Sequence, residues 1–256
     1  MLRSRPATRL TLRACLLVAA AGVASALPAP RAHAQEFVPP PNSNIRSVLE
    51  FGAVPDDGLD DLPAFQNALN ALVGSGRTLY VPRGVYDFSD RLNWGGVNGG
   101  GSFTLQGQSR EGVVLRLADG APGFGDPATP RVFIDAYEGN TANQFRTYLR
   151  DVTIDVGSNN PGVIGLQFQS NNTGRMEDVT VRSPGPARAG VVGLDLAFNF
   201  PGPFLARNIT IEGFNEGVRG APQEYNVVFE NLTLRNQNVR GAAFWRLPVQ
   251  IRNLVS

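Results

Sequence analysis

The stretch Asp151-Val-Thr-Ile154 recurs three times in the second half of this 256-residue chain, as Asp178-Val-Thr-Val181, Asn208-Ile-Thr-Ile211 and Asn231-Leu-Thr-Leu234. Asn253-Leu-Val255 begins the same way, and successive copies lie 27, 30, 23 and 22 residues apart. A second series falls between the copies: Gly162-Val-Ile-Gly165, Gly190-Val-Val-Gly193, Gly217-Val-Arg-Gly220 and Asn238-Val-Arg-Gly241. Two short strands in each period, joined by turns rich in Gly, Asn and Pro, indicate the coils of a β-solenoid.

The alternation within the first series predicts which side chains face inward, since neighbouring residues of a strand point to opposite sides. Two interior rows are expected, the first of Val152, Val179, Ile209, Leu232 and Leu254, the second of Ile154, Val181, Ile211 and Leu234. The Thr between them is expected to face outward. The Asp or Asn that opens each copy is expected at a turn, stacked on its equivalents and hydrogen-bonded to the backbone.

Residues 47–88 carry a different pattern. Ser47-Val-Leu-Glu-Phe51 predicts a short strand, and an acidic loop follows it. Apolar residues at helical spacing predict a helix at 62–73, with Asp60 or Asp61 as its cap. Strands are expected again within 78–88.

Residues 1–34 have the features of a secretory signal, namely an Arg-rich start, an apolar stretch and the small-residue site Ala32-His33-Ala34. The apolar stretch is too short to span a bilayer. After residues 1–34 are cleaved, we expect no membrane association of the remaining chain. Residues 35–46 are expected to form a linker, and 47–256 the folded domain. The protein is therefore expected to be secreted or periplasmic.

The single Cys15 and the single His33 both lie in this segment, and the chain has no Lys. Without residues 1–34, the formal net charge changes from +1 to −4, with 18 Arg against 22 acidic residues. The remaining chain cannot form a disulfide, a thiol nucleophile or a His-based triad. A mildly acidic chain without Lys is also a poor candidate for binding nucleic acid.

Three stretches resemble one family: Phe51-Gly-Ala-Val-Pro-Asp-Asp-Gly-Leu-Asp-Asp61, Ala64-Phe-Gln-Asn-Ala-Leu69 and Thr78-Leu-Tyr-Val-Pro-Arg-Gly-Val-Tyr86. The family is the pectate lyase superfamily domain of the rhamnogalacturonase/epimerase-like type. The resemblance implies an all-β, right-handed parallel β-helix with a short N-terminal capping helix. It leaves the reaction open, because relatives include polysaccharide lyases, glycoside hydrolases, epimerases and phage tailspikes.

The resemblance also implies that a polysaccharide substrate lies along one parallel sheet, which the strands with the Gly-Val-x-Gly pattern resemble. The Asp pair of the polygalacturonase type, with its later His and Arg-Ile-Lys motif, is missing. The candidates on these strands are Asp195, Glu216 and Arg219 as catalytic residues and Gln167 and Arg240 as substrate-binding residues. Gln167 and Asp195 are expected in equivalent positions one coil apart, and so are Arg219 and Arg240.

Two mechanisms fit these residue types. Elimination from a uronate needs a cation to neutralise the carboxylate and a base to remove the neighbouring proton, and Arg219 beside Arg240 would suit the anion. Hydrolysis needs two carboxylates about 5–9.5 Å apart, which Asp195 and Glu216 could supply. A noncatalytic surface or glycan-binding module is the alternative to both.

Two further expectations concern ions and the end of the chain. The four acids within 56–61 could form a Ca²⁺ loop, although acids favoured at a helix N-terminus explain them more simply. The segment 251–256 begins a strand with no polar cap after it. We therefore expect a domain that is incomplete at its C-terminal end, either because the chain is a fragment of a longer protein or because self-association covers this coil. An inactive fragment of a longer enzyme is accordingly a further alternative to the enzyme hypothesis.

Overall fold

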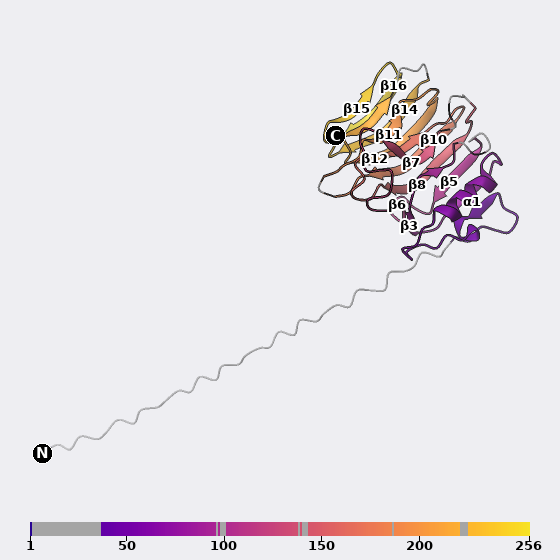
Figure 1. Ribbon diagram of the computed structural model, residues 1–256, viewed down its shortest axis with the longest axis horizontal. Coiled ribbons are helices and arrows are strands. Elements are labelled where there is room, and N and C mark those ends of the chain that lie inside the picture. Colours follow the sequence, from indigo (N-terminus) through magenta and orange to yellow (C-terminus); the bar gives the residue numbers. More distant parts are fainter. Residues whose placement is uncertain are drawn as a thin grey trace. The chain divides into compact units, whose positions relative to one another are not determined.

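Parallel strands form successive coils around an apolar interior in the unit Glu36–Ser256 (Figure 1). This computed structural model describes residues 1, 37–95, 97, 101–137, 139, 143–185, 187–220 and 225–256. Apart from Met1, the predicted signal segment lies outside the described residues, as do residues 35 and 36 of the predicted linker. In the described part, no helix is long and apolar enough to cross a membrane.

The strands belong to two sheets, and the strands within each sheet pair in parallel. The ten-stranded sheet consists of β1 (Ile45–Ser47), β2 (Thr78–Val81), β3 (Gly84–Phe88), β5 (Phe103–Gly107), β6 (Val113–Leu117), β8 (Thr147–Asp155), β10 (Gly174–Arg182), β12 (Phe204–Glu212), β14 (Val227–Arg235) and β16 (Val249–Val255). The six-stranded sheet consists of β4 (Leu92–Asn93), β7 (Arg131–Ala136), β9 (Val163–Phe168), β11 (Val192–Leu196), β13 (Glu216–Gly220) and β15 (Arg240–Phe244). The predicted parallel β-helix is confirmed.

The long strands β8, β10, β12 and β14 bend at the Asp or Asn that opens each repeat. The bending residues have positive φ: Asp151 (60°), Asp178 (54°), Asn208 (55°), Asn231 (58°) and, in β16, Asn253 (59°). Asn and Asp tolerate this left-handed region better than other residues with a side chain. Before the bend β8 pairs with β5, and after it β8 pairs with β6. One long strand therefore serves two faces of the solenoid.

The bending residues stack as predicted, but their hydrogen bonds differ from the prediction. Asn208 Nδ2 donates to Asp178 Oδ1 (3.0 Å), Asn231 Nδ2 to Asn208 Oδ1 (2.8 Å) and Asn253 Nδ2 to Asn231 Oδ1 (2.9 Å). The expected bonds to the backbone are thus replaced by a ladder of side chains. A carboxamide both donates and accepts, so equivalent groups one strand apart satisfy each other.

The interior rows are confirmed by register and burial. Val152, Val179, Ile209 and Leu232 are register partners and are fully buried, and the second row from Ile154 to Leu234 is buried as well. Leu254 also pairs in register with Leu232, yet it is 51% exposed. The Thr residues face outward, and Thr153 is covered by the backbone of Arg110.

The predicted strand at Ser47–Phe51 is wrong. The segment Val48–Phe51 is a 3₁₀ helix, and the strand β1 precedes it, beginning at Ile45 within the predicted linker. The reason is a capping box, in which Glu50 Oε1 accepts from Ser47 N while Ser47 Oγ accepts from Leu49 N, and Gly52 ends the turn at φ 98°. The helix α1 (Leu62–Leu72) is where the apolar spacing predicts it.

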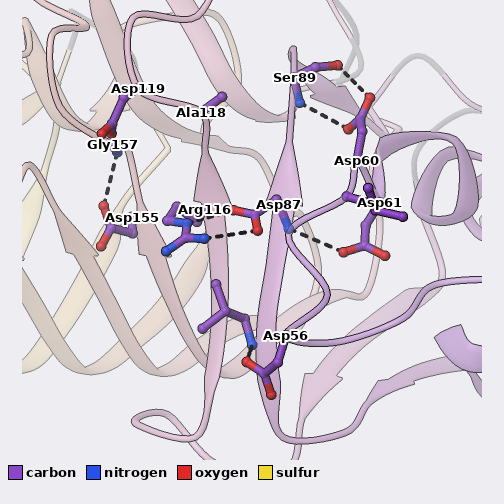
Figure 2. Close-up of polar contacts among 12 residues, drawn as sticks. Asp56, Asp60, Asp61, Asp87, Ser89, Arg116, Ala118, Asp119, Asp155 and Gly157 are labelled. Carbon is purple, nitrogen blue, oxygen red and sulfur yellow. Dashed lines mark hydrogen bonds and ion pairs between the residues drawn. The ribbon is translucent and has the colours of Figure 1, made fainter.

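The acidic loop before α1 binds the edge of β3 (Figure 2). Alternate backbone N–H groups of that edge donate to three aspartates: Val85 N to Asp56 Oδ1 (2.9 Å), Asp87 N to Asp61 Oδ2 (3.2 Å) and Ser89 N to Asp60 Oδ1 (3.0 Å). Asp60 also accepts from Leu62 N (3.1 Å), whereas Asp61, at the N-cap position, makes no cap bond to the helix. The loop therefore covers a strand edge that would otherwise be open.

We expect Asn231→Ala to lower the free energy of unfolding by about 2–4 kcal/mol, because it removes two ladder hydrogen bonds and places a Cβ residue without a local polar partner at positive φ. Asn231→Gly removes the same bonds but adopts this φ freely, so its loss should be smaller. Urea denaturation measures both. Equal losses for the two variants would show that the backbone conformation contributes nothing.

Candidate functional site

The outward side chains of the six-stranded sheet stack in rows along the solenoid. One row, given by strand register, consists of Asn93, Asp135, Gln167, Asp195, Arg219 and Ala243. The predicted equivalence of Gln167 and Asp195 is confirmed, and Gln167 Nε2 donates to Asp195 Oδ2 at 2.9 Å. Three of the five candidate residues therefore belong to one row.

The predicted equivalence of Arg219 and Arg240 is wrong. Register pairs Arg219 with Ala243 and Arg240 with Glu216. The chain stacks Gly217 against Gly241, where a Cβ on Gly217 would lie 2.3 Å from the Gly241 carbonyl oxygen. The close approach of the two backbones requires a glycine there. The two Arg-containing segments are therefore offset by three residues from the alignment that their sequences suggest.

Asp195 is buried, with 3% of its surface exposed, and it holds Arg219 in place. Its Oδ1 accepts from Arg219 Nε (3.1 Å) and from Ala197 N (3.0 Å), and its Oδ2 accepts from Arg219 Nη2 (3.0 Å) in addition to Gln167. Burial alone would lower the pKa of Arg219, but the hydrogen bonds and charge of Asp195 outweigh it and raise that pKa. Arg219 is thus a fixed cation.

Glu216 and Arg240 form a looser pair in the neighbouring row. Arg240 Nη2 donates to Glu216 Oε1 at 2.7 Å, and the Arg240 side chain is 54% exposed. Glu216 Oε2 is buried, and no group of the described residues donates a hydrogen bond to it. Such an orphaned acceptor is uncommon in a folded protein and is a natural place for a ligand or a proton.

A cavity of about 400 Å³ brings three of the candidates together. Glu216, Arg219 and Arg240 line it with Trp245, whose side chain is 73% exposed. Asp195 lies behind Arg219 and Gln167 behind Asp195, so neither lines this cavity. Sequence reasoning missed Trp245. The signal was its place directly after Asn238-Val-Arg-Gly241, the last segment of the second repeat series.

Sequence reasoning also missed Asp135, which belongs to the same row as Asp195. It is 8% exposed and accepts from Arg91 Nη1 (3.2 Å) and Tyr137 N (3.2 Å). Burial raises the pKa of Asp135, and these two donors oppose that effect. The repeat is recognisable in the sequence from Asp151 onward, so Asp135, in an earlier coil, has no repeat pattern to align with.

The Ca²⁺ site considered for residues 56–61 can be compared with the contacts of these acids. Among the described residues, no three or more His, Cys, Asp or Glu side chains are grouped so that they could hold a metal ion. Asp56, Asp60 and Asp61 of the predicted Ca²⁺ loop instead accept backbone N–H groups, as described above. Of the role that the sequence suggests for these acids at the helix N-terminus, the structure shows one contact, from Leu62 N to Asp60 Oδ1.

Asp195→Ala should lower the free energy of unfolding by about 2–4 kcal/mol, because it leaves the guanidinium of Arg219 without its buried partner. The double variant Asp195→Ala/Arg219→Met should recover most of that loss, since no unpaired charge remains. Chemical denaturation of both proteins measures the difference. A double variant less stable than the single one would contradict this account.

A comparison with solved protein structures found proteins of the same fold. It is similar to ORF18 of Geobacillus virus E2 (17% identity, 75% of this chain and 42% of that chain, TM-score 0.52). It is also similar to PfbA, a surface adhesin of Streptococcus pneumoniae (16% identity, 81% of this chain and 56% of that chain, TM-score 0.52). The matched region thus spans less than two thirds of either protein, and at these identities the likeness shows the fold alone.

A comparison with curated proteins found no match. Residues 45–254 match the family model described as rhamnogalacturonase A/epimerase, pectate lyase-like. The match includes the acidic loop, α1 and the strands of every coil. The chain therefore belongs to the rhamnogalacturonase A/epimerase, pectate lyase-like family, as the resemblance within residues 51–86 predicts.

Proposed function

We propose that this protein is an exported carbohydrate-active protein that binds an acidic polysaccharide on the six-stranded sheet and cleaves it by lyase chemistry. Membership of the pectate lyase-like family supports action on a polysaccharide. The observation that carries the proposal is the cavity that combines Arg219, Arg240, Glu216 and the exposed Trp245. Guanidinium groups pair with a uronate carboxylate, and an exposed indole stacks on a sugar ring.

Each residue has a role in the proposed elimination. Arg219, fixed by Asp195, and the more exposed Arg240 neutralise the uronate carboxylate, which makes the adjacent C–H bond more acidic. When the substrate carboxylate takes Arg240 from Glu216, the Glu216 carboxylate becomes free to accept that proton. The C–H electron pair forms the new C=C bond, the C–O bond to the leaving sugar breaks, and the leaving oxygen takes up a proton from solvent.

Hydrolysis fits the geometry less well. A glycoside hydrolase of the usual type needs two carboxylates facing the substrate. Glu216 is the one carboxylate among the residues that line the described cavity. Asp195 is buried, and both of its oxygens already accept two hydrogen bonds. A role for Asp195 as a positioning residue, acting through Arg219, suits these contacts better than a catalytic one.

A noncatalytic glycan-binding module is the second candidate. Arg219 and Arg240 are each paired with a carboxylate of the protein, and the folded domain contains no His or Lys that could act as a base. A surface that only binds an anion needs no base. The lyase and the noncatalytic module would therefore bind the same acidic glycan, but only the lyase would convert it to product.

Incubation with polygalacturonate and with alginate, with and without Ca²⁺, distinguishes these functions. Ultraviolet absorbance of an unsaturated product would support the lyase. New reducing ends without that absorbance would indicate a hydrolase, and binding without either product would favour the noncatalytic module. No binding and no product with any acidic glycan would overturn the proposal.

Arg240→Ala and Trp245→Ala should each weaken binding of the acidic glycan by about tenfold, the effect of one lost charge-assisted or stacking contact. Arg175→Ala and Val239→Ala are matched controls, because Arg175 lies on the other sheet and Val239 is another exposed apolar residue. Isothermal titration calorimetry measures the four affinities. Equal affinities for Arg240→Ala and Arg175→Ala would remove Arg240 from the site.

Export is proposed from the basic and apolar character of residues 1–34. Expression of the full chain in a Gram-negative host should yield a periplasmic or secreted protein with a new N-terminus near Gln35. The matched control begins at Gln35 and should stay in the cytoplasm. N-terminal sequencing of each fraction checks the prediction, and an uncleaved cytoplasmic full-length chain would contradict it.

A further inference from the structure

A second polar cavity, of about 400 Å³, lies on the ten-stranded sheet and shares no residue with the first. We call it the arginine trough. It is lined by Asp178, Asn208, Thr210, Asn231, Thr233, Arg110 and Arg235. Its volume falls within the range of about 300–1,000 Å³ that is usual for sites of small ligands.

Arg110 reaches the trough from the loop between β5 and β6. Its backbone oxygen accepts from Thr153 Oγ1 (2.7 Å), and its Nη1 donates to the backbone oxygen of Asn208 (3.5 Å). Arg110 Nε also pairs with the exposed Glu111 at 2.8 Å. These contacts hold a guanidinium group beside the row of stacked amides, and the loop that carries it is anchored on a strand of the next coil.

The floor of the trough repeats polar groups at the strand spacing. Thr210 and Thr233 are register partners on the outward face, and Asn208 and Asn231 are adjacent members of the amide ladder. Each ladder amide uses one N–H and one oxygen lone pair in hydrogen bonds to its neighbours. Its second N–H and its second lone pair stay available for a ligand. The floor therefore offers hydroxyl and amide groups about 4.8 Å apart along the solenoid.

Arg235 gives the trough a cation that can bind an anion. Arg235 is exposed, and although Glu212 is its register partner, it makes no ion pair within the described part of the chain. Arg110 adds a second guanidinium, which is paired with Glu111, and the one carboxylate of the lining, Asp178, already accepts from Asn208 Nδ2. No apolar or aromatic side chain lines the cavity, so a hydroxyl-rich anion suits it better than an aromatic or lipid-like one.

We propose that the arginine trough is a second binding site, which holds a uronate-bearing oligosaccharide. Arg235 pairs with a uronate carboxylate, and the Asn and Thr rows bond to the sugar hydroxyls. The ligand class is that of the proposed function, but the site requires neither the proposed reaction nor any residue of the six-stranded sheet.

The test uses the full chain carrying Arg219→Ala and Arg240→Ala, which disables the first cavity. Calorimetric titration with tetramers of galacturonate and of mannuronate should reveal remaining binding to one of them. Adding Arg235→Ala should weaken that binding about tenfold, as expected for one lost bidentate pair, and Arg235→Lys should recover part of it. Arg175→Ala in the same background is the control, and thermal unfolding verifies that each variant is folded.

Three results would overturn the proposal. The first is that no uronate tetramer binds once the first cavity is disabled. The second is that Arg235→Ala and Arg175→Ala bind the tetramer equally well. The third is that inorganic sulfate competes as strongly as the tetramer, which would make the trough a general anion site. A failed proposed function would instead show as unchanged binding when Arg219 and Arg240 are replaced while Arg235 is intact.

Discussion

Parallel stacking in register, one strand spacing per coil, is the constraint on which this structure depends. It places every side chain next to its equivalent in the following coil, so the side chains of each row must be able to pack or pair with one another. Aliphatic rows satisfy this requirement inside, and carboxamides satisfy it at the bends. Charged residues satisfy it by alternation in the row Arg150, Glu177, Arg207, Glu230 and Arg252. Each exposed ion pair stabilises the fold by at most about 1 kcal/mol, but a slip by one coil would bring like charges together.

The same constraint creates a problem where the stack begins, because the first strand of a face has no coil to pair with. At β3, three aspartates of one loop take the place of the missing strand. Their carboxylates accept hydrogen bonds from alternate N–H groups of the strand edge (Figure 2). Burial raises the pKa of Asp61, and its hydrogen bonds to Val54 N and Asp87 N oppose that effect. The four acids that look like an ion-binding loop in the sequence thus serve mainly as acceptors for the backbone.

The sequence predicts the rows that depend on a period of two and fails where the coil length changes. The interior rows and the bends follow from the Asp/Asn-x-Thr-x repeat alone. The offset of Arg219 from Arg240 does not, because Gly-x-x-Gly can be aligned at either glycine, and only the contact between Gly217 and the Gly241 carbonyl decides between them. Ser47–Phe51 alternates like a strand, but the local capping box at Ser47 and Glu50 prevails. Trp245 and Asp135 belong to no repeat, so only the folded chain places Trp245 at the cavity and Asp135 in the row of Asp195.

The two arginines of the first cavity differ because their rows differ. Gln167 separates Asp135 from Asp195 by two coils, or about 9.6 Å, and lends an amide hydrogen bond to Asp195. An acid in place of Gln167 would set three carboxylates side by side. Beside this neutral spacer, Asp195 fixes the guanidinium of Arg219, from which it accepts two parallel hydrogen bonds. Arg240 has one bond to Glu216 and a half-exposed side chain, so it can exchange partners. A fixed cation beside an exchangeable one is an arrangement that can both orient an anion and respond to its arrival.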